Sequence, residues 1–268
     1  MRQPQLLLLA AYLAWATPVL AEEPTPTAEK SEEELAKEAQ NPVADLYSFP
    51  FQENIGLNYG PEKGVQNILN FEPVIPIHAG PVNIITRTII PLVTTPYVSP
   101  EQSGATGLGD INLSAFVSPA KPGALIWGIG PSFNFPTATS PQVGSQSTWG
   151  LGPALVLLTM PGPWVIGVVV NNIWSIAGPH ANALFLQYFI NYNFGGGWYA
   201  TSQPVITADW TQPSGNQWTV PFGGGFGKLQ KIGKIPLNFQ AEAFWTAFHP
   251  DTSPYTPWVI RLQVTLIL

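Results

Sequence analysis

The chain has 268 residues and no cysteine, and its 16 Asp and Glu outnumber its 10 Lys and Arg. The missing cysteines exclude a disulfide framework, thiol chemistry and a lipid-anchor cysteine. Seven acids lie between Glu22 and Glu38, and beyond Asp45 eight acids face seven Lys and Arg. The body of the chain is therefore near neutral and lacks the basic footprint that nucleic-acid binding requires.

The first 21 residues have the pattern of a secretory signal peptide. Arg2 supplies the positive start, Leu6 to Ala16 is apolar, and the sequence ending at Ala21 suits cleavage. We expect residues 1–21 to be removed on export. The alternative is a retained membrane anchor.

Residues 22–45 are predicted to be a periplasmic N-terminal segment with one short helix. Residues 22–31 are rich in Pro, Thr and Glu, as disordered segments are. Ser31 suits the N-cap of a helix from Glu32 to Gln40, with Glu34 completing a capping box and Asn41-Pro42 ending it. The segment either stays solvated or acts as a short plug at the mouth of a barrel.

From Leu46 onward, runs of about ten residues rich in Val, Ile, Thr and aromatics alternate with Gly, Pro, Asn and Ser turns. Between Asp110 and Asp209, Lys121 is the single Lys, Arg, Asp or Glu. Ordinary soluble domains are near 25% charged, so such a stretch favours a surface that does not face water. The predicted strands are 46–57, 65–78, 83–95, 108–118, 124–136, 149–160, 164–177, 183–194, 198–210, 218–228, 236–248 and 258–268.

No run of ~20 uninterrupted apolar residues follows the leader, so a membrane helix is not predicted. The best candidate, Ala154–Val170, contains Pro161-Gly162-Pro163, and each proline would cost a helix ~3 kcal/mol. A closed sheet is the other structure that can span a bilayer. We therefore expect an all-β fold, in which residues 46–268 form a transmembrane antiparallel up-and-down β-barrel of about twelve strands.

The lengths of the connections predict an orientation. Several of the even-numbered connections are tight, and most of the odd-numbered ones are longer and more polar. Barrels of this kind have short periplasmic turns and long external loops. The tight connections are Gly80-Pro81, Lys121-Pro122-Gly123, Pro161-Gly162-Pro163 and Gly195-Gly196-Gly197, and the long ones are 96–107, 137–148, 211–217 and 249–257.

Alternation along the strands separates a lipid face from a lumen face. In the last strand, Trp258, Leu262 and Val264 share one face, while Arg261 and Gln263 share the other. A second group of residues has the position of an aromatic girdle near strand ends. These residues are Trp149, Trp164, Trp174, Trp198, Trp210, Trp218 and Trp258.

Inward-facing polar residues are the candidates for lumen lining and solute binding. In strand 83–95 the alternation leaves open which face carries Arg87. Most of the predicted lining between Asp110 and Asp209 is neutral, so we expect weak ion selectivity. Gly223-Gly224-Gly225 and Gly227 predict curvature or added lumen width. The candidate residues are Glu72, Arg87, Asp110, Asn112, Asn134, Gln187, Asn191, Gln203, Asp209, Glu242 and Arg261.

No catalytic, metal or cofactor site is predicted. His78, His180 and His249 fall at different depths, and no His pair has the spacing of metal ligands. The rim near His249 offers Asp251, Thr252 and Ser253 as a weak hydrolase constellation.

Across nearly all the chain after the leader, the motifs resemble those of an outer-membrane family named for the meta-pathway of phenol degradation. The resemblance implies a β-barrel of the bacterial outer membrane that takes up small, hydrophobic or aromatic solutes. Its partners would be outer-membrane lipid, the assembly machinery and the solute. The matching stretches are ELAKEAQNPVADLYSFPFQ (34–52), NILNFEPVIP (67–76), ITRTIIP (85–91), GLGDIN (107–112), SPAKPGALIWGIGPSFNFPTAT (118–139), WGLGPALVLL (149–158), GPWVIGVVVNNIWSIAG (162–178) and GWYATSQPVITADW (197–210).

The sequence therefore favours an outer-membrane channel or transporter for small, uncharged or hydrophobic solutes. Two alternatives remain open at this stage. One is a barrel enzyme that acts on lipids, and the other is a structural barrel whose lumen is closed by its own side chains.

Overall fold

The computed structural model describes residues 30–97, 103–251 and 254–268. The predicted signal peptide and most of the predicted disordered stretch lie outside these residues. Ser31–Leu268 is one compact unit, and the account below concerns that unit. Its elements, in chain order, are α1 (Glu32–Ala39), β1 (Ser48–Tyr59), β2 (Gly64–Phe71), β3 (Val74–Ala79), β4 (Val82–Thr95), β5 (Ala105–Leu108), β6 (Ile111–Pro119), β7 (Leu125–Phe135), β8 (Trp149–Thr159), β9 (Trp164–Ala177), β10 (Asn182–Gly195), β11 (Trp198–Ser202), β12 (Val205–Asp209), β13 (Trp218–Ile232), β14 (Ile235–Phe248) and β15 (Trp258–Ile267).

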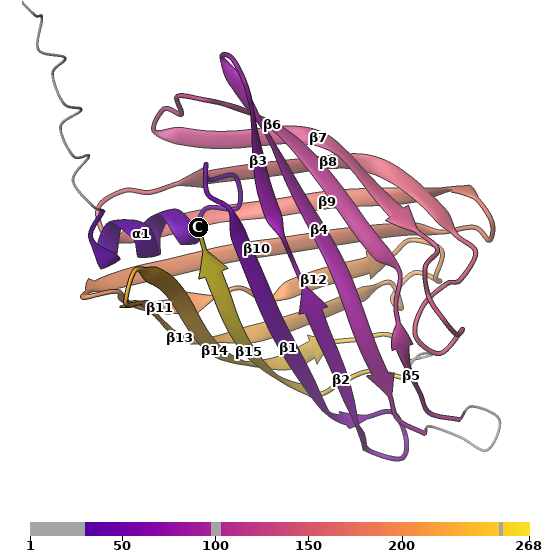
Figure 1. The fold of residues 1–268 in the computed structure, drawn as a ribbon. Coiled ribbons are helices and arrows are strands. Elements are labelled where there is room, and N and C mark those ends of the chain that lie inside the picture. The colour runs from indigo at the N-terminus through magenta and orange to yellow at the C-terminus, as the bar shows by residue number, and fades with distance from the viewer. Residues whose placement is uncertain (1–29, 98–102, 252–253) are drawn as a thin grey trace, which may run out of the picture. The chain divides into compact units, whose positions relative to one another are not determined.

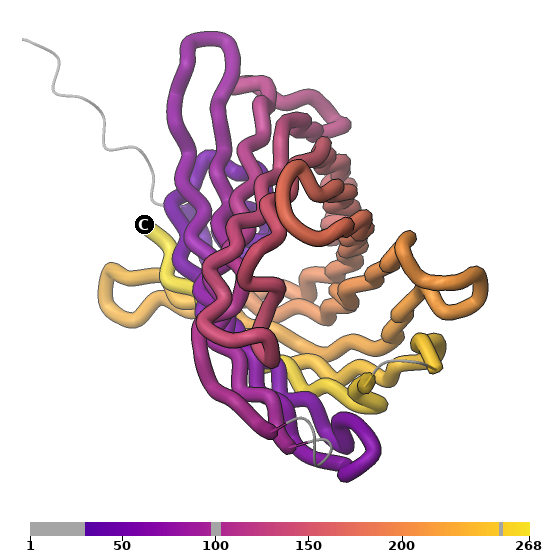
Figure 2. The backbone as a smooth tube through the Cα atoms, turned by 90° about the vertical axis from the view of Figure 1, so that its right-hand side faces the viewer, coloured from indigo at the N-terminus to yellow at the C-terminus, as the bar shows by residue number. Residues whose placement is uncertain are grey.

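All the strands belong to one antiparallel sheet that closes on itself (Figure 1). Strands that adjoin in the wall pair antiparallel, and the wall closes because β1 pairs with β15. The pairing of β9 with β10 joins the two halves of the chain. Three wall positions consist of two short strands each, namely β2 with β3, β5 with β6, and β11 with β12. Counted this way, the wall is the closed 12-strand barrel that the sequence predicted. Figure 2 shows these strands running around a common interior.

The three split strands break at residues that interrupt a ladder. The breaks fall at Glu72-Pro73, Gly109-Asp110 and Gln203-Pro204. Proline has no N–H to donate to a neighbouring strand, and glycine weakens a strand interior. Each break coincides with a predicted lumen residue, so these side chains lie where the regular strand is interrupted.

The exterior of the barrel carries large apolar side chains. Phe51, Trp127, Phe226 and Leu262 are among many that are exposed, and Phe226 exposes 62% of its surface. Soluble monomers rarely expose contiguous apolar patches of more than a few hundred Å². Such an exterior suits the hydrocarbon of a bilayer.

Six of the seven predicted girdle tryptophans are exposed near strand ends, and Trp210 is the exception. It lies just after β12, donates its indole N–H to Asn172 Oδ1 at 2.8 Å and packs edge-on against Trp218. No helix in the described part of the chain is long and apolar enough to cross a membrane.

The N-terminal helix forms as its sequence predicts. Glu34 N–H donates to Ser31 Oγ at 3.1 Å, and Ser31 N–H donates to Glu34 Oε2 at 3.0 Å, which completes the capping box. The helix ends at Ala39, one residue earlier than expected, with Gln40 as its C-cap. Its buried side, Leu35 and Ala36, packs against Leu229 and Ile267 of the wall.

Two further predictions concern the wall. Alternation holds in β15, where Arg261 is buried while Trp258, Leu262 and Val264 are exposed. Strand β13 runs to Ile232, four residues beyond the predicted end. The glycines of β13 let the strand lie close to its neighbour, because a Cβ on Gly225 would lie 1.8 Å from the Ala241 carbonyl.

Candidate functional site

The interior of the barrel contains two adjacent chambers on the side away from α1. Their volumes are about 470 and 610 Å³. The two chambers adjoin each other, because the same residues line both. These shared residues are Arg87, Ile89, Phe185, Thr207 and Thr219. We call these two cavities the outer chambers.

The smaller outer chamber is lined by both neutral polar and charged side chains. Asn112, Asn134 and Asp209 line it, together with Arg87 and Asp110. Asp209 accepts hydrogen bonds from Thr211 and Gln212. Asp110 accepts the backbone N–H groups of Ala138 and Ser145, so it anchors the long connection after β7. Both carboxylates are thus engaged with nearby turns of the chain.

Beyond the outer chambers, towards α1, the lumen is crossed by a ring of polar and charged side chains that we call the polar belt. The belt includes two Glu and two Arg, so its formal charges cancel. Its members come from seven wall positions. They are Arg87, Glu72, Gln52, Asn54, Arg261, Glu242, Gln203 and Gln187.

One half of the polar belt centres on Glu72. Arg87 Nη2 donates to Glu72 Oε2 at 2.6 Å, and both side chains are largely buried. Asn70 Nδ2 and Gln52 Nε2 donate to the other carboxylate oxygen at 3.2 and 3.5 Å. The structure also settles the register of β4, because Arg87 faces the lumen together with Ile89. Three hydrogen bonds to Glu72, one of them from the Arg87 guanidinium, therefore fix this pair at the edge of the chambers.

The other half centres on Arg261 and Glu242. Arg261 Nε donates to Asn54 Oδ1 at 2.9 Å, and its Nη1 lies 3.6 Å from Glu242 Oε2. Glu242 accepts the side-chain amide of Gln240 at 2.7 Å and the backbone N–H of Gln203 at 3.0 Å. The Arg261 guanidinium also lies 4.8 Å from the Phe244 ring centroid. Both charged groups are thus buried with partners, as buried charges must be.

A third cavity of about 110 Å³ lies between the polar belt and the segment after α1. Gln52, Glu72, Arg87 and Gln187 line both this cavity and the larger outer chamber, so they form the boundary between them. The far side of the small cavity is formed by Gln40, Asn41, Pro42, Ala44 and Leu46. The N-terminal segment therefore reaches the lumen, as the plug alternative predicted.

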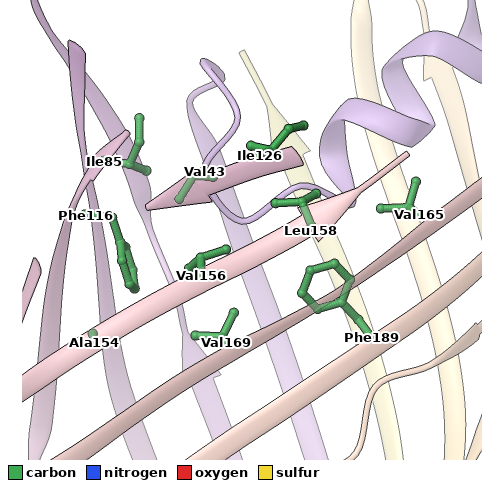
Figure 3. Packing of buried hydrophobic residues seen from close by; sticks show 10 residues of the cluster. All are labelled: Val43, Ile85, Phe116, Ile126, Ala154, Val156, Leu158, Val165, Val169 and Phe189. Carbon is green, nitrogen blue, oxygen red and sulfur yellow. The ribbon is translucent and has the colours of Figure 1, made fainter. Parts of the chain in front are cut away.

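Contacts along residues 32–45 hold this segment against the wall. Gln40 and Asn193 exchange side-chain amide hydrogen bonds of 3.0 and 3.3 Å. Val43 is buried among wall residues that include Ile126 and Leu158 (Figure 3). Asp45 contacts His78 Nε2 at 2.8 Å at the exposed rim.

Two of the predicted lumen-lining residues, Asn191 and Glu242, do not line any of the three cavities described above. Asn191 is fully buried, lines none of the cavities described above, and its Nδ2 has no partner among the described residues. Glu242 is buried behind Arg261 and also lines none of these cavities. Sequence reasoning missed Gln52, Asn54 and Gln240. The alternation of Gln52 and Asn54 with Phe51, Glu53 and Ile55 in β1 is the signal that points to the first two.

The rim near His249 gives no support to a hydrolase. The His249 ring stacks on Tyr255 with centroids 3.4 Å apart, and its Nδ1 lies 3.2 Å from the Pro250 carbonyl. Neither contact directs the ring to a serine or threonine hydroxyl. Thr252 and Ser253 lie outside the described residues. The described residues also hold no group of three or more His, Asp or Glu arranged for a metal ion.

The chain is similar to known proteins in its structure but not in its sequence. No family model matches the chain, and no curated protein matches it. The resemblance to the phenol meta-pathway family therefore stays a prediction.

Among solved structures, the chain is similar to the COG4313 outer membrane channel from Pseudomonas putida F1. The TM-score is 0.62 at 13% identity, over 83% of this chain and 94% of that one. Lower scores relate it to the monoaromatic hydrocarbon channel CymD (TM-score 0.46, 7% identity, 89% and 91% covered) and to outer membrane phospholipase A from Escherichia coli (TM-score 0.40, 13% identity, 84% and 92% covered). The chain thus has the fold of an outer-membrane β-barrel.

Proposed function

We propose that the protein is a channel of the bacterial outer membrane for small uncharged solutes of hydrophobic or aromatic character. The observation that carries this proposal is the interior, where two chambers lie above a charge-balanced polar belt in a barrel with an apolar exterior. A structural barrel with a filled lumen would lack such chambers. The shared fold of the Pseudomonas channel and the motifs that resemble the phenol meta-pathway family support the same function.

The lengths of the connections support an orientation. The tight turns and α1 lie at one end of the barrel, since Lys37 Nζ reaches the carbonyl of Gly162 and Lys231 N–H reaches Glu32. This end faces the periplasm in our proposal, and the long connections face outward. The leader at residues 1–21 would deliver the chain for export, and the assembly machinery would read its last strand. A solute from outside then meets the outer chambers first.

The lining of the chambers supports the solute class. Amide and hydroxyl groups such as Asn112 and Thr207 stand beside Ile89 and Phe185. Pockets for small molecules commonly combine a mainly apolar lining with a few polar groups. The charges of the polar belt pair with each other, so we expect little preference between anions and cations.

The N-terminal segment acts as a plug in this proposal. Residues 31–46 cover the periplasmic side of the lumen through buried contacts at Leu35, Gln40 and Val43. The resting channel is therefore closed to large hydrated solutes at that end, and displacement of the segment would open it.

Liposome swelling tests the proposal. Vesicles containing the folded protein, and a variant lacking residues 31–46, would be exposed to neutral, anionic and cationic solutes of matched size. We expect swelling in the shortened variant for all three classes, with little discrimination by charge. The proposal is wrong if a variant that folds, as judged by a heat-modifiable gel shift, admits none of the solutes.

A further inference from the structure

The wall of the barrel has a seam where backbone pairing stops. Strand β11 pairs with β13 as far as Thr201 with Gly225, and β12 pairs with β13 again only at Thr207 with Thr219. Between these pairs, residues 202–206 face residues 220–224 without a ladder. The two stretches have equal length, so the gap is a loss of pairing and not a register shift.

The sequence of β13 removes groups that a ladder would need. Pro221 lacks an N–H, so the seam has one donor fewer on the β13 side. Gly223 and Gly224 add no side chain. One side-chain hydrogen bond crosses the seam next to the Thr201–Gly225 pair, from Ser202 Oγ to the Gly223 carbonyl at 2.6 Å.

The polar belt takes over the backbone groups of Gln203. Its N–H donates to Glu242, while its carbonyl accepts from Arg261 Nη1 at 2.8 Å and from Gln187 Nε2 at 3.4 Å. Glu242 and Arg261 reach Gln203 across the inner face of β13, where Gly225 is paired with Glu242 and presents no side chain. Gln187 reaches it from the neighbouring strand β10. Because Gly225 has no side chain, the Glu242–Arg261 pair can form hydrogen bonds with the backbone of Gln203 in the seam.

Some residues of the seam are apolar, and these lie on both faces of the wall. Val205 and Pro221 line the larger outer chamber, and Phe222 exposes 48% of its surface on the outside. The seam begins two residues along β13 from Trp218, an exposed residue of the aromatic girdle. It therefore lies just inside the outer interface of the membrane in the orientation proposed above.

An unpaired backbone at membrane depth is costly unless it borders protein or a cavity. Here the seam borders the outer chamber, while the N-terminal segment covers the other end of the lumen. We propose that the seam between β12 and β13 is a lateral portal, through which an apolar, uncharged solute passes between the larger outer chamber and the hydrocarbon of the outer leaflet. This inference rests on the proposed channel function and names the route of the solute.

A disulfide across the seam tests the portal, because the chain has no cysteine of its own. The register on either side of the gap places Ile206 opposite Val220, so a disulfide between these positions would join β12 to β13 within the seam. The staple variant is Ile206→Cys with Val220→Cys. The matched control is Leu157→Cys with Val168→Cys, a directly paired position in the continuous β8–β9 wall.

The readout is the rate at which the apolar dye 1-N-phenylnaphthylamine enters intact cells with a lipopolysaccharide outer leaflet. We expect the wild type to raise this rate above that of cells without the protein. The oxidised staple should abolish the gain, dithiothreitol should restore it, and the control disulfide should leave it unchanged. A second variant, Pro221→Val, restores the missing N–H donor of β13 without a staple and should also reduce the rate.

The outcomes separate the two proposals. The portal is overturned if the oxidised staple and the valine variant both retain the full dye rate, or if the wild type gives no gain in dye rate. The channel proposal stands in either case if liposome swelling is observed. The absence of swelling in the variant lacking residues 31–46 would overturn the channel, and the portal with it.

Discussion

Arg261 and Gln203 are joined by a hydrogen bond of 2.8 Å from guanidinium Nη1 to the backbone carbonyl, although β13 and β14 separate their strands in the wall. The bond can form because the inner face of β13 carries glycine at Gly225, opposite Glu242. A buried arginine thus supplies the partner that a neighbouring strand would ordinarily provide. The Glu242–Arg261 pair in the lumen therefore also holds a part of the wall in which strand pairing is interrupted.

Replacing Glu242 by Ala should destabilise the barrel strongly. The change leaves Arg261 buried without its anion and frees the Gln203 N–H, and breaking one partner of a buried pair costs about 3–5 kcal/mol. Urea unfolding in lipid vesicles, followed by tryptophan fluorescence, measures the loss. The double variant Glu242→Leu with Arg261→Met removes both charges and should be less destabilised than Glu242→Ala. Equal stability of the wild type and Glu242→Ala would contradict the assignment.

Shortening Val43 to Ala should loosen the plug. Val43 is 6% exposed in the apolar cluster of the wall. Losing two methyl groups at ~0.8 kcal/mol each removes roughly 1.6 kcal/mol of burial, which corresponds to about a fifteenfold change in an equilibrium. Single-channel recording in planar bilayers should therefore show a higher open fraction. Lys121→Ala, an exposed change in the β6–β7 turn, is the control and should leave the open fraction unchanged.

The architecture could be predicted from the sequence because a membrane wall imposes a period of two over every strand. The lack of charge, the tight turns and the alternation around Arg261 all follow from the requirement that the strands form a membrane-spanning wall. The capping box of α1 is equally local, since Ser31 and Glu34 are three residues apart. These features depend on neighbours along the chain, and the structure reproduces them closely.

The polar belt depends instead on contacts between distant segments. Alternation places Glu242 on the inner face, but nothing local shows that its carboxylate caps Gln203, 39 residues away. The same holds for Gln40 and Asn193, which are 153 residues apart. The burial of Asn191 is likewise set by packing around it, which one strand's pattern does not contain.

The position of Gly227 shows a role for this glycine that the sequence pattern did not predict. The glycine run predicted curvature or added lumen width, and at Gly227 the space is filled, because a Cβ there would lie 2.1 Å from Tyr199 Cζ. We expect Gly227→Ala to overpack this contact and destabilise the barrel by about 1–3 kcal/mol. Gly123→Ala is the matched control, since a Cβ there meets nothing within 4 Å. Equal urea midpoints for the two variants would show that the Tyr199 ring moves aside freely.

Ion selectivity should respond in opposite directions to the two members of the Glu72–Arg87 pair. Glu72→Gln keeps the size of the side chain but leaves the Arg87 charge uncompensated at the boundary of the chambers, so the pore should become anion-selective. Arg87→Gln leaves Glu72 alone and should make it cation-selective. Zero-current potentials across planar bilayers in a KCl gradient measure both shifts, in the background lacking residues 31–46.

Lys121→Gln changes the charge by the same amount as Arg87→Gln, but in an exposed turn away from the lumen, and it should leave the potential near the parent value. Exposed charges are screened within about 10 Å at 0.1 M salt, whereas charges beside a narrow pore act directly on the passing ion. If Lys121→Gln shifted the potential as far as Arg87→Gln, selectivity would arise from the net charge of the protein. A shift confined to the Glu72 and Arg87 variants, with opposite signs, would place the selectivity-determining boundary at the polar belt.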